Sequence, residues 1–316
     1  MKKLKLGIVG LGAIGERLIK VLLTHEGFKI TGIFDASNSR LQEIAEQYDL
    51  PSMDSFEAML SSPEIEAVYL AVPPKSHSEM AIKIVESGKH ILCEKPLAST
   101  VDEAEKMLAA AKKSGVVHAM NFPLNYTSAI AKMDTLLSNR EIGIVKGIEI
   151  YGRFPNWPRL WQINPWIDSK DQGGFTREVF THFVQIVVDR FGPIKSLCTT
   201  ITYPMESNKS ETVLLAHGRL DDEIPIAFSG LTGIGHYEEI KLVIYGDKKT
   251  LELSNWRDLF ISDDETGRQK VSLDEVNASY VLIDAFYQKI LGNPAKVIDF
   301  TSGHKTTEVI ESLLDN

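Results

Sequence analysis

The segment Gly10-Leu11-Gly12-Ala13-Ile14-Gly15 has the GxGxxG spacing of a turn that binds the pyrophosphate of a dinucleotide. In such a turn Gly10 permits a tight bend, Gly12 lets the backbone approach the phosphates, and Gly15 allows the following helix to pack closely on the strand. The N–H groups of Ala13 and Ile14 then open the helix and meet the phosphates with its positive dipole end. The alternative is an ordinary strand-to-helix turn without a ligand.

An acidic residue stands at the position that such a turn uses for the adenosine ribose. Asp35 ends the next β-branched stretch, 20 residues after Gly15. A carboxylate there accepts hydrogen bonds from ribose hydroxyls and repels a 2′-phosphate, so Asp35 favours NAD over NADP. Ser37, Ser39 and Arg40 follow closely and could hold a phosphate, which leaves NADP open. For Arg40 the alternative is a solvated residue in the first turn of the next helix.

A lysine follows another strand-like segment, Ile91-Leu92-Cys93. Ligands of parallel sheets bind beyond the carboxyl ends of the strands, which is where Lys95 lies. Pro96 favours extended backbone at Lys95 and so helps to aim the ammonium into a cleft. The alternative for Lys95 is a solvated surface lysine.

Polar residues recur at helical spacing in the second half of the chain, after Gln172-Gly173-Gly174. Glu178, His182, Gln185 and Asp189 form one narrow stripe on a helix whose other positions are almost all apolar. Such a helix is buried, so its polar stripe needs a wet cleft or polar partners. We expect His182 to give and take protons, with Glu178 one turn earlier orienting its imidazole. The alternative for His182 is a satisfied or solvated histidine.

Three of the four tryptophans gather between Trp157 and Trp166 in a loop-like stretch. Their aromatic faces predict part of a substrate pocket, with Trp161 as the first candidate and Arg159 or Arg177 drawing an anionic group. Core packing or a subunit contact is the alternative for each tryptophan.

These residues need a scaffold that brings strand ends together. Residues 1–122 alternate β-branched runs with amphipathic helical patterns, which predicts an α/β Rossmann domain with a parallel, doubly wound sheet. Its expected strands are 6–9, 30–34, 67–72, 90–93 and 116–120.

Residues 123–316 have a different pattern, which predicts an α+β domain for substrate binding and oligomerisation. A helix over 128–137 precedes alternating segments that favour a large, mainly antiparallel open sheet, and helices over 280–291 and 305–314 follow. The expected strands are 146–154, 197–203, 213–220, 224–229, 240–245 and 250–253.

Composition excludes several classes of protein. A chain of 316 residues with 43% hydrophobic residues exceeds one hydrophobic core, in agreement with two domains. A net charge of -9 argues against a nucleic-acid partner. Cys93 and Cys198 are too few and too far apart for a disulfide framework, and no metal-ligand spacing occurs. With no signal peptide and no membrane span, we expect a cytoplasmic protein.

Two further motifs make the chain resemble the Gfo/Idh/MocA family, which includes glucose-fructose oxidoreductase, inositol dehydrogenases and dihydrodiol dehydrogenases. They are Ala71-Val72-Pro73-Pro74-Lys75-Ser76-His77 and Glu94-Lys95-Pro96. The resemblance implies that the first motif lies along the cofactor, that Lys95 is catalytic and that Glu94 lies near the nicotinamide. We therefore assign to the cofactor Val72, Pro73, Pro74, His77 and Glu94, and add Asn121 after the last strand of the domain.

The sequence departs from the family pattern in the second half. Glu178 and Gln185 stand where relatives carry Asp, and Phe180 stands where Gly is common. Asn125 lies near the place of a frequent Arg, and Arg153-Phe154-Pro155 lacks a polar residue between Arg and Pro. These changes remove groups that would hold a sugar, so we keep the hypothesis of a substrate with fewer hydroxyls than inositol or glucose.

Residues and resemblance together predict transfer of a hydride between a nicotinamide and a hydroxyl or carbonyl carbon of a small sugar, polyol or related cyclic alcohol or ketone. Two alternatives stay open: a non-catalytic dinucleotide sensor or regulator with this fold, and a reductase of a larger conjugated substrate. Family members pair subunits through the open sheet, so we expect a homodimer or homotetramer.

Overall fold

The computed structural model describes residues 3–162, 164–206, 208–221 and 223–315, which form two compact units. The first unit consists of Met1–Pro123 and Asn277–His304, and the second of Leu124–Val276 and Lys305–Asn316. The change from the first unit to the second near residue 123 lies where the sequence predicts a boundary. The assignment of all later residues to one domain was wrong, because Asn277–His304 returns to the first unit.

Aromatic packing explains this return of the chain. The ring of Phe28 stacks on Phe286 at a centroid distance of 6.0 Å and meets the ring of Tyr287 edge-on at 5.5 Å. The N–H group of Phe300 donates a hydrogen bond of 3.1 Å to the His118 ring. Such contacts between distant segments leave no periodic signal in the sequence.

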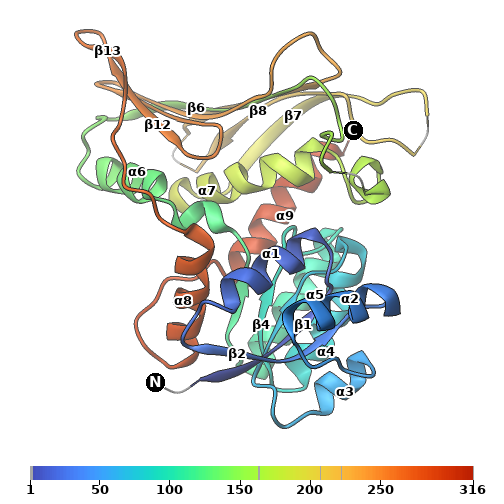
Figure 1. The fold of residues 1–316 in the computed structure, drawn as a ribbon. Coiled ribbons are helices and arrows are strands. Elements are labelled where there is room, and N and C mark those ends of the chain that lie inside the picture. Colours follow the sequence, from blue (N-terminus) through green and yellow to red (C-terminus); the bar gives the residue numbers. More distant parts are fainter. Residues whose placement is uncertain (1–2, 163, 207, 222, 316) are drawn as a thin grey trace. The chain divides into compact units, whose positions relative to one another are not determined.

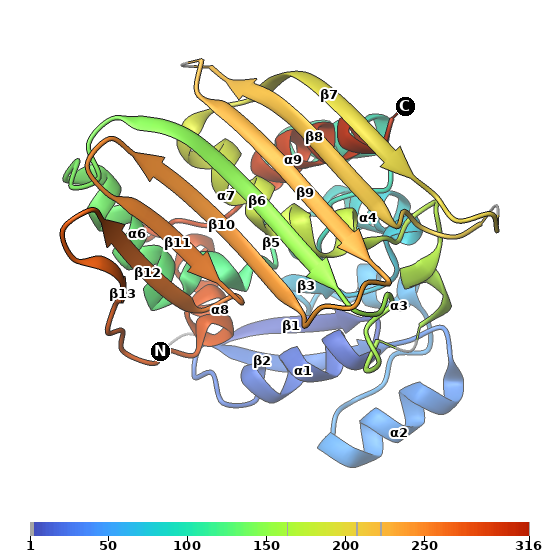
Figure 2. The same ribbon diagram turned by 90° about the horizontal axis from the view of Figure 1, so that it is seen from above.

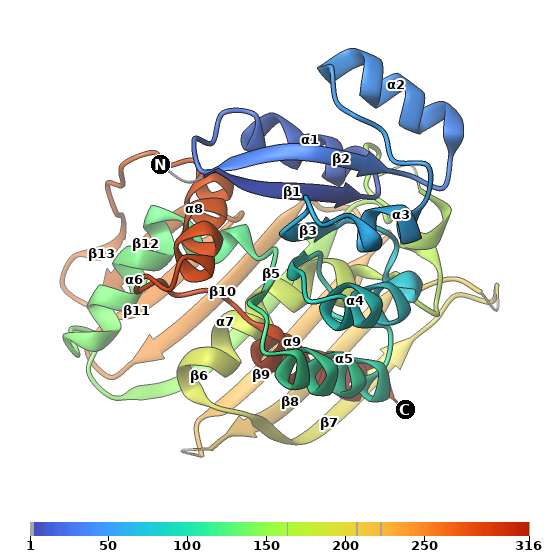
Figure 3. The same cartoon turned by 90° about the horizontal axis from the view of Figure 1, so that it is seen from below.

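The first unit is built on a sheet whose described strands are all parallel, as predicted (Figure 3). Its order is β2-β1-β3-β4-β5, so the order reverses between β1 and β3, and ligands of such sheets bind at this switch point. The strands are β1 (Leu4–Val9), β2 (Phe28–Phe34), β3 (Ala67–Leu70), β4 (His90–Cys93) and β5 (His118–Met120).

Helices cover both faces of this sheet. Helix α1 packs with α8, whereas α4 packs with α5 (Figure 3). Thr100 caps α5 by accepting a hydrogen bond from the Glu103 N–H group, and the helix ends at Gly115 in the left-handed conformation, both as predicted. The helices are α1 (Ala13–Leu22), α2 (Asn38–Tyr48), α3 (Phe56–Ser61), α4 (His77–Glu86), α5 (Val101–Ser114) and α8 (Ala278–Ile290).

The second unit contains a large sheet with the order β13-β12-β11-β10-β6-β9-β8-β7 over the described residues (Figure 2). Neighbouring strands are antiparallel except for the parallel pair β6 and β9, which confirms the predicted mainly antiparallel sheet. The strands are β6 (Val145–Phe154), β7 (Ile194–Thr202), β8 (Val213–Leu220), β9 (Pro225–Thr232), β10 (Glu239–Gly246), β11 (Thr250–Ser254), β12 (Asp258–Asp263) and β13 (Gly267–Lys270).

One face of this sheet packs on helices and forms the core of the unit. Helices α6 (Ser128–Ser138) and α7 (Thr181–Phe191) lie on that face, together with the part of α9 (Phe300–Leu314) that belongs to this unit (Figure 1). Ile148, Ile150 and Phe154 of β6 point into this core, while the alternate residues of β6 are exposed or half-buried. No helix in the described ranges is long and apolar enough to cross a membrane.

Candidate active site

The glycine turn after β1 is shaped by the backbone around it. Gly10 adopts a φ of +90°, and a Cβ atom there would overlap the carbonyl group of Ala71 after β3. A Cβ atom at Gly15 would overlap the Gly10 carbonyl oxygen, whereas none of the described atoms lies within 4 Å of a Cβ built at Gly12. The turn thus needs glycine at 10 and 15 for packing and leaves the space over Gly12 open.

Helix α1 begins at this open position. Gly12 is its N-cap, and no side chain among the described residues caps the first turn. The N–H groups of Ala13 and Ile14 lie in that turn, where the four N-terminal N–H groups of a helix lack partners within the helix. An uncapped helix start beside an open glycine fits the pyrophosphate of a dinucleotide.

Asp35 is tied to the same turn. Its Oδ2 atom accepts a hydrogen bond of 2.7 Å from the Leu11 N–H group, and its Oδ1 atom accepts one of 2.8 Å from Ser37. Each carboxylate oxygen retains capacity for a further hydrogen bond. The structure therefore brings Asp35 beside the glycine turn, as the sequence predicts for a ribose ligand.

The Arg40 guanidinium is occupied by protein groups. Its Nε atom donates to the Leu11 carbonyl oxygen at 2.8 Å, and its other nitrogens pair with Glu16 at 2.6 Å and Glu43 at 2.8 Å. Tyr48, Arg40 and the nearby Lys20 lower the pKa of Glu16 to about 2. Arg40 thus contacts the glycine turn through the Leu11 carbonyl oxygen, and its assignment as a direct cofactor ligand stays a prediction.

A buried polar cluster lies at the carboxyl ends of the other strands. Glu94, after β4, accepts a hydrogen bond of 2.5 Å from the Tyr69 hydroxyl group and another from the Asn121 amide. Burial raises the pKa of Glu94, and the contacts with Asn121 and Tyr69 oppose that shift. The Asn121 Oδ1 atom is buried and accepts no hydrogen bond in the described part of the chain. Glu94 and Asn121 thus lie together, and the Asn121 Oδ1 atom is available to accept a hydrogen bond.

Tyr69 is the member of this cluster that the sequence analysis missed. It lies in the apolar strand β3 and is fully buried, so its hydroxyl group requires a partner. That requirement was the available signal: a tyrosine inside a buried strand one residue before the strand end.

His77 joins two loops and is completely buried. One ring nitrogen lies 2.8 Å from the Pro96 carbonyl oxygen and the other 2.8 Å from that of Val72. Burial lowers the pKa of His77. The residue therefore ties the loop after β3 to the segment after Lys95. Its assignment as a cofactor ligand stays a prediction.

The residues on either side of this tie differ in exposure. Pro73 is exposed, Val72 is half-buried and Pro74 is buried. Lys95 is half-buried at the end of β4, and its peptide bond to Pro96 is cis. At the carboxyl edge of the parallel sheet, the side chains that remain accessible to a ligand are therefore those of Val72, Pro73 and Lys95. Pro74 is packed inside the protein.

In the second unit a π-helix, Thr176–Phe180, precedes α7 and carries Glu178. The sequence pattern predicts an ordinary α-helix here. Glu178 is buried, His182 is half-buried, and the His182 ring meets the Trp256 ring edge-on at a centroid distance of 5.2 Å. π-Helical turns inside α-helices are frequent at functional sites.

The start of the π-helix is fixed by a buried carboxylate. Gly174 adopts a φ of +97°, and a Cβ atom there would overlap the carboxylate of Glu211. Glu211 accepts a hydrogen bond of 2.8 Å from the Thr176 N–H group. Burial raises the pKa of Glu211, and Thr176 opposes the shift. The glycine pair thus allows a carboxylate to hold the helix that carries His182.

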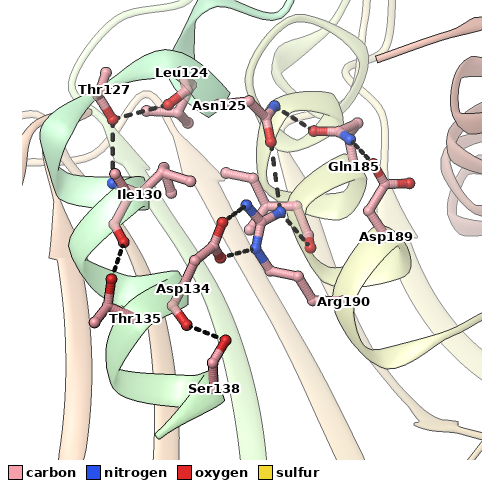
Figure 4. A network of polar contacts seen from close by, with 12 residues as sticks. Leu124, Asn125, Thr127, Ile130, Asp134, Thr135, Ser138, Gln185, Asp189 and Arg190 are labelled. Carbon is pink, nitrogen blue, oxygen red and sulfur yellow. Dashed lines mark hydrogen bonds and ion pairs between the residues drawn. The ribbon is translucent and has the colours of Figure 1, made fainter. Parts of the chain in front are cut away.

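The remainder of the polar stripe has protein partners (Figure 4). The Gln185 Oε1 atom accepts a hydrogen bond of 2.5 Å from Asn125, and Gln185 donates one of 2.6 Å to Asp189. Arg190 pairs with Asp134 at 2.5 Å. Asn125 and Gln185, two positions at which the sequence departs from the family pattern, are therefore in contact with each other.

The two predicted substrate residues differ in their surroundings. Trp161 is 65% exposed. Arg177 is buried and pairs with both carboxylate oxygens of Glu311 at 2.8 and 2.7 Å, and it donates to the Lys170 carbonyl oxygen at 2.8 Å. The assignment of Arg177 to a substrate anion is not supported, because its donors hold the π-helix to α9.

Comparison with known proteins agrees with this geometry. Residues 4–122 match the GFO_IDH_MocA model, which describes an oxidoreductase family with an NAD-binding Rossmann fold. Over these residues the chain is similar to the Gfo/Idh/MocA family. The matched residues include the glycine turn, Asp35, Glu94, Lys95 and Asn121.

Individual relatives match over part of their length. The uncharacterized oxidoreductase YrbE of Bacillus subtilis (strain 168) is 31% identical over 160 residues, which is 50% of this chain and 47% of the relative. The scyllo-inositol 2-dehydrogenase (NADP(+)) IolU of the same organism is 35% identical over 115 residues, 36% of this chain and 35% of the relative. The chain thus matches less than half the length of each of these two relatives.

A solved structure shows that the fold extends over both units. A levoglucosan dehydrogenase in complex with NADH and levoglucosan superposes with a TM-score of 0.87. The sequences are 18% identical, and the match covers 99% of this chain and 96% of that one. As for metals, the described residues contain no group of three or more His, Cys, Asp or Glu arranged to hold an ion.

Proposed function

We propose that the protein is an NAD(P)-dependent oxidoreductase that acts on a hydroxyl or carbonyl carbon of a small substrate. The observation that carries this proposal is the edge of the parallel sheet in the first unit. Four features follow strands of that sheet: the uncapped helix start over Gly12, the Asp35 carboxylate, the Glu94–Asn121 cluster and Lys95. The match of residues 4–122 to an oxidoreductase family model supports the same reaction class.

The residues at this edge divide the work of binding the cofactor. The first turn of α1 would hold the pyrophosphate, Asp35 the adenosine ribose, and the open Asn121 acceptor the nicotinamide half. When bound, the nicotinamide supplies or accepts a hydride. We infer a preference for NAD, because Glu16 and Glu43 take up the charge of Arg40 and leave Asp35 to repel a 2′-phosphate.

Lys95 and His182 are the groups that we assign to the substrate. The Lys95 ammonium stabilises negative charge on the substrate oxygen, and His182 takes the hydroxyl proton or returns it. Buried Glu178, earlier on the same helical segment, orients the imidazole.

We further propose a homodimer or homotetramer that forms through the outer face of the large sheet. Val213 and Leu231 pair across β8 and β9, and Leu215 is their neighbour on that face. Leu215 is 46% exposed. Open sheets usually cover such a face, and a second copy of the chain would do so.

We propose a cytoplasmic location, which agrees with the two free cysteines.

Fluorescence titration of the purified chain with NADH and NADPH tests the proposal. We expect saturable binding, tighter for NADH, and oxidation of the bound NADH by at least one compound from a panel of sugars, keto compounds and cyclic ketones. Binding without oxidation by any carbonyl compound would point to the non-catalytic sensor. Absence of binding would refute the cofactor site itself.

A further inference from the structure

A buried guanidinium in the loop after β6 has an unused hydrogen-bonding edge. Arg159 is only 9% exposed, and its Nε atom donates to both carboxylate oxygens of Glu238 at 3.0 Å. Its Nη1 atom reaches Gln162 only at 3.5 Å. Its Nη2 atom is buried and has no hydrogen-bond partner in the described ranges. A buried donor without a partner is unfavourable in a folded protein, so such a group calls for a ligand.

Aromatic rings form most of the surroundings of this guanidinium. The Arg159 Cζ atom lies 5.3 Å from the ring centroid of Phe154, 5.5 Å from that of Trp157 and 5.8 Å from that of Trp161. The first two rings are buried or half-buried, whereas Trp161 is largely exposed. A hydrogen bond in such an apolar setting is stronger than one in water.

The position of Arg159 within the second unit connects it with His182. Arg153, at the end of β6, pairs with Glu239 at the start of β10 and with Leu231 near the end of β9. Lys241 pairs in turn with Ser254, the last residue of β11. The segments that follow β6, β9 and β11 therefore emerge at one end of the sheet.

Each of these segments carries part of the arrangement. The segment after β6 carries Arg159, the segment after β9 carries Glu238, and the segment after β11 carries Trp256, whose ring contacts His182. A row of ring contacts also runs from Trp157 through Phe175 to Phe180. Arg159 thus lies at the end of the sheet that serves the candidate proton carrier.

The structure separates the two arginines that the sequence left as alternatives for an anion. Arg177 directs its donors to Glu311 and to the carbonyl oxygens of Lys170 and Gly173. Arg159 retains the edge formed by Nη1 and Nη2, which matches the two oxygens of a carboxylate. Glu238 already offsets its charge, so a singly charged group fits this aromatic surrounding better than a phosphate dianion.

We propose that the Nη edge of Arg159 binds the carboxylate of the substrate, and that the substrate class is therefore a small hydroxy or keto acid of sugar-acid type, packed against Trp161. This inference rests on the proposed function, because it assigns a subsite to the substrate of that reaction. It accounts together for the orphaned Nη2 atom, the exposed tryptophan and the neutralising Glu238.

Calorimetric titration of the NADH-loaded chain tests this subsite. The probes are D-glucuronate, D-galacturonate and D-gluconate, with D-glucose as the neutral counterpart of glucuronate. We expect the wild type to bind at least one acid more tightly than glucose. Arg159→Gln should weaken that acid about 10- to 100-fold, the effect of losing a hydrogen bond to a charged group, and leave glucose and NADH affinities unchanged.

The matched control is Arg219→Gln, which removes an exposed arginine that pairs with Glu223 on the outer part of the sheet. It should bind the acids like the wild type. Arg159→Lys keeps the positive charge but loses the edge formed by Nη1 and Nη2, so it should also weaken binding of the acid. Thermal unfolding of each variant checks that it folds. We expect the Arg159 variants to fold, because the Glu238 side chain is 39% exposed and water can solvate its carboxylate when Arg159 is replaced.

The outcomes distinguish this inference from the proposed function. Equal acid affinity in the wild type and Arg159→Gln, or no binding of any of the three acids to the wild type, would overturn the subsite. A chain that binds an acid through Arg159 but never exchanges hydride with any substrate would refute the oxidoreductase proposal and leave the subsite standing.

Discussion

At the scale of single residues, we propose that Asp35 selects the cofactor. Its two oxygens are held by the N–H groups of Leu11 and Ser37, so the carboxylate has a fixed place beside the glycine turn. Arg40, the group that would attract a 2′-phosphate, is enclosed by Glu16 and Glu43. The groups around Asp35 and Arg40 are therefore negatively charged on balance, which is the basis of the proposed preference for NAD.

Asp35→Ala should weaken NADH binding about 10-fold, because it removes a hydrogen-bond acceptor of the ribose, and should narrow the preference for NADH over NADPH. Fluorescence titration with both cofactors measures the ratio of the two affinities. Glu46→Ala, on the exposed face of α2, is the control. An unchanged ratio in Asp35→Ala would show that another group selects the cofactor.

The sequence predicted which residues lie at the carboxyl edge of the parallel sheet better than it predicted the partners of their side chains. Motif spacing located Gly10, Asp35 and Lys95 because strand ends in a parallel sheet are set by local pattern. Motif spacing could not show which of the predicted side chains contact other protein groups. His77 lies inside the predicted cofactor motif but is fully buried between two carbonyl oxygens. Arg177 donates to Glu311, which is 134 residues away in sequence.

At the scale of elements, the buried pair of Arg177 and Glu311 joins the π-helix to α9, and we expect it to contribute strongly to the stability of the protein. Arg177→Ala should destabilise the protein by about 3–5 kcal/mol, because it leaves the Glu311 carboxylate and two carbonyl groups without their partner in a largely buried place. Urea unfolding of the full chain measures this loss. Arg219→Ala, which breaks an exposed pair, should cost less than about 1 kcal/mol. Similar losses in the two variants would mean that the buried pair contributes nothing special.

Strand β8 was predictable from its alternating pattern, whereas β12 (Asp258–Asp263), β13 and the π-helix were not. Strand β8 begins and ends where alternation predicts, at Val213 and Leu220. Strand β13 was missed because all four of its residues, Gly267–Lys270, are exposed and none is apolar. The π-helix was missed because its extra residue per turn depends on Glu211 and Gly174, which meet only in the folded chain.

At the scale of the whole molecule, the sequence indicated two domains but not the crossing of the chain between them. Helix α8 belongs with α1 because Phe286 and Tyr287 pack on Phe28, a contact between the two ends of the chain. Composition and periodicity report burial within a segment and carry no information about which distant segment provides it.

Association of subunits through the large sheet is a prediction at this scale. Leu215→Glu places a charge on the outer face beside Val213 and Leu231, so it should convert the oligomer to a smaller species in light scattering coupled to size exclusion. Ile144→Glu, which also changes an exposed apolar residue but lies before β6, is the control and should not alter the mass. A wild-type chain that is monomeric, or a variant with unchanged mass, would refute this interface.

The central claim is that Lys95 stabilises charge on the substrate while the nicotinamide exchanges a hydride. Its most direct test is the turnover rate of Lys95→Met, followed through NADH absorbance with any substrate that the wild type accepts. The account predicts a rate about 10²- to 10⁴-fold below the wild type, with NADH affinity largely kept. Turnover at the wild-type rate would contradict it.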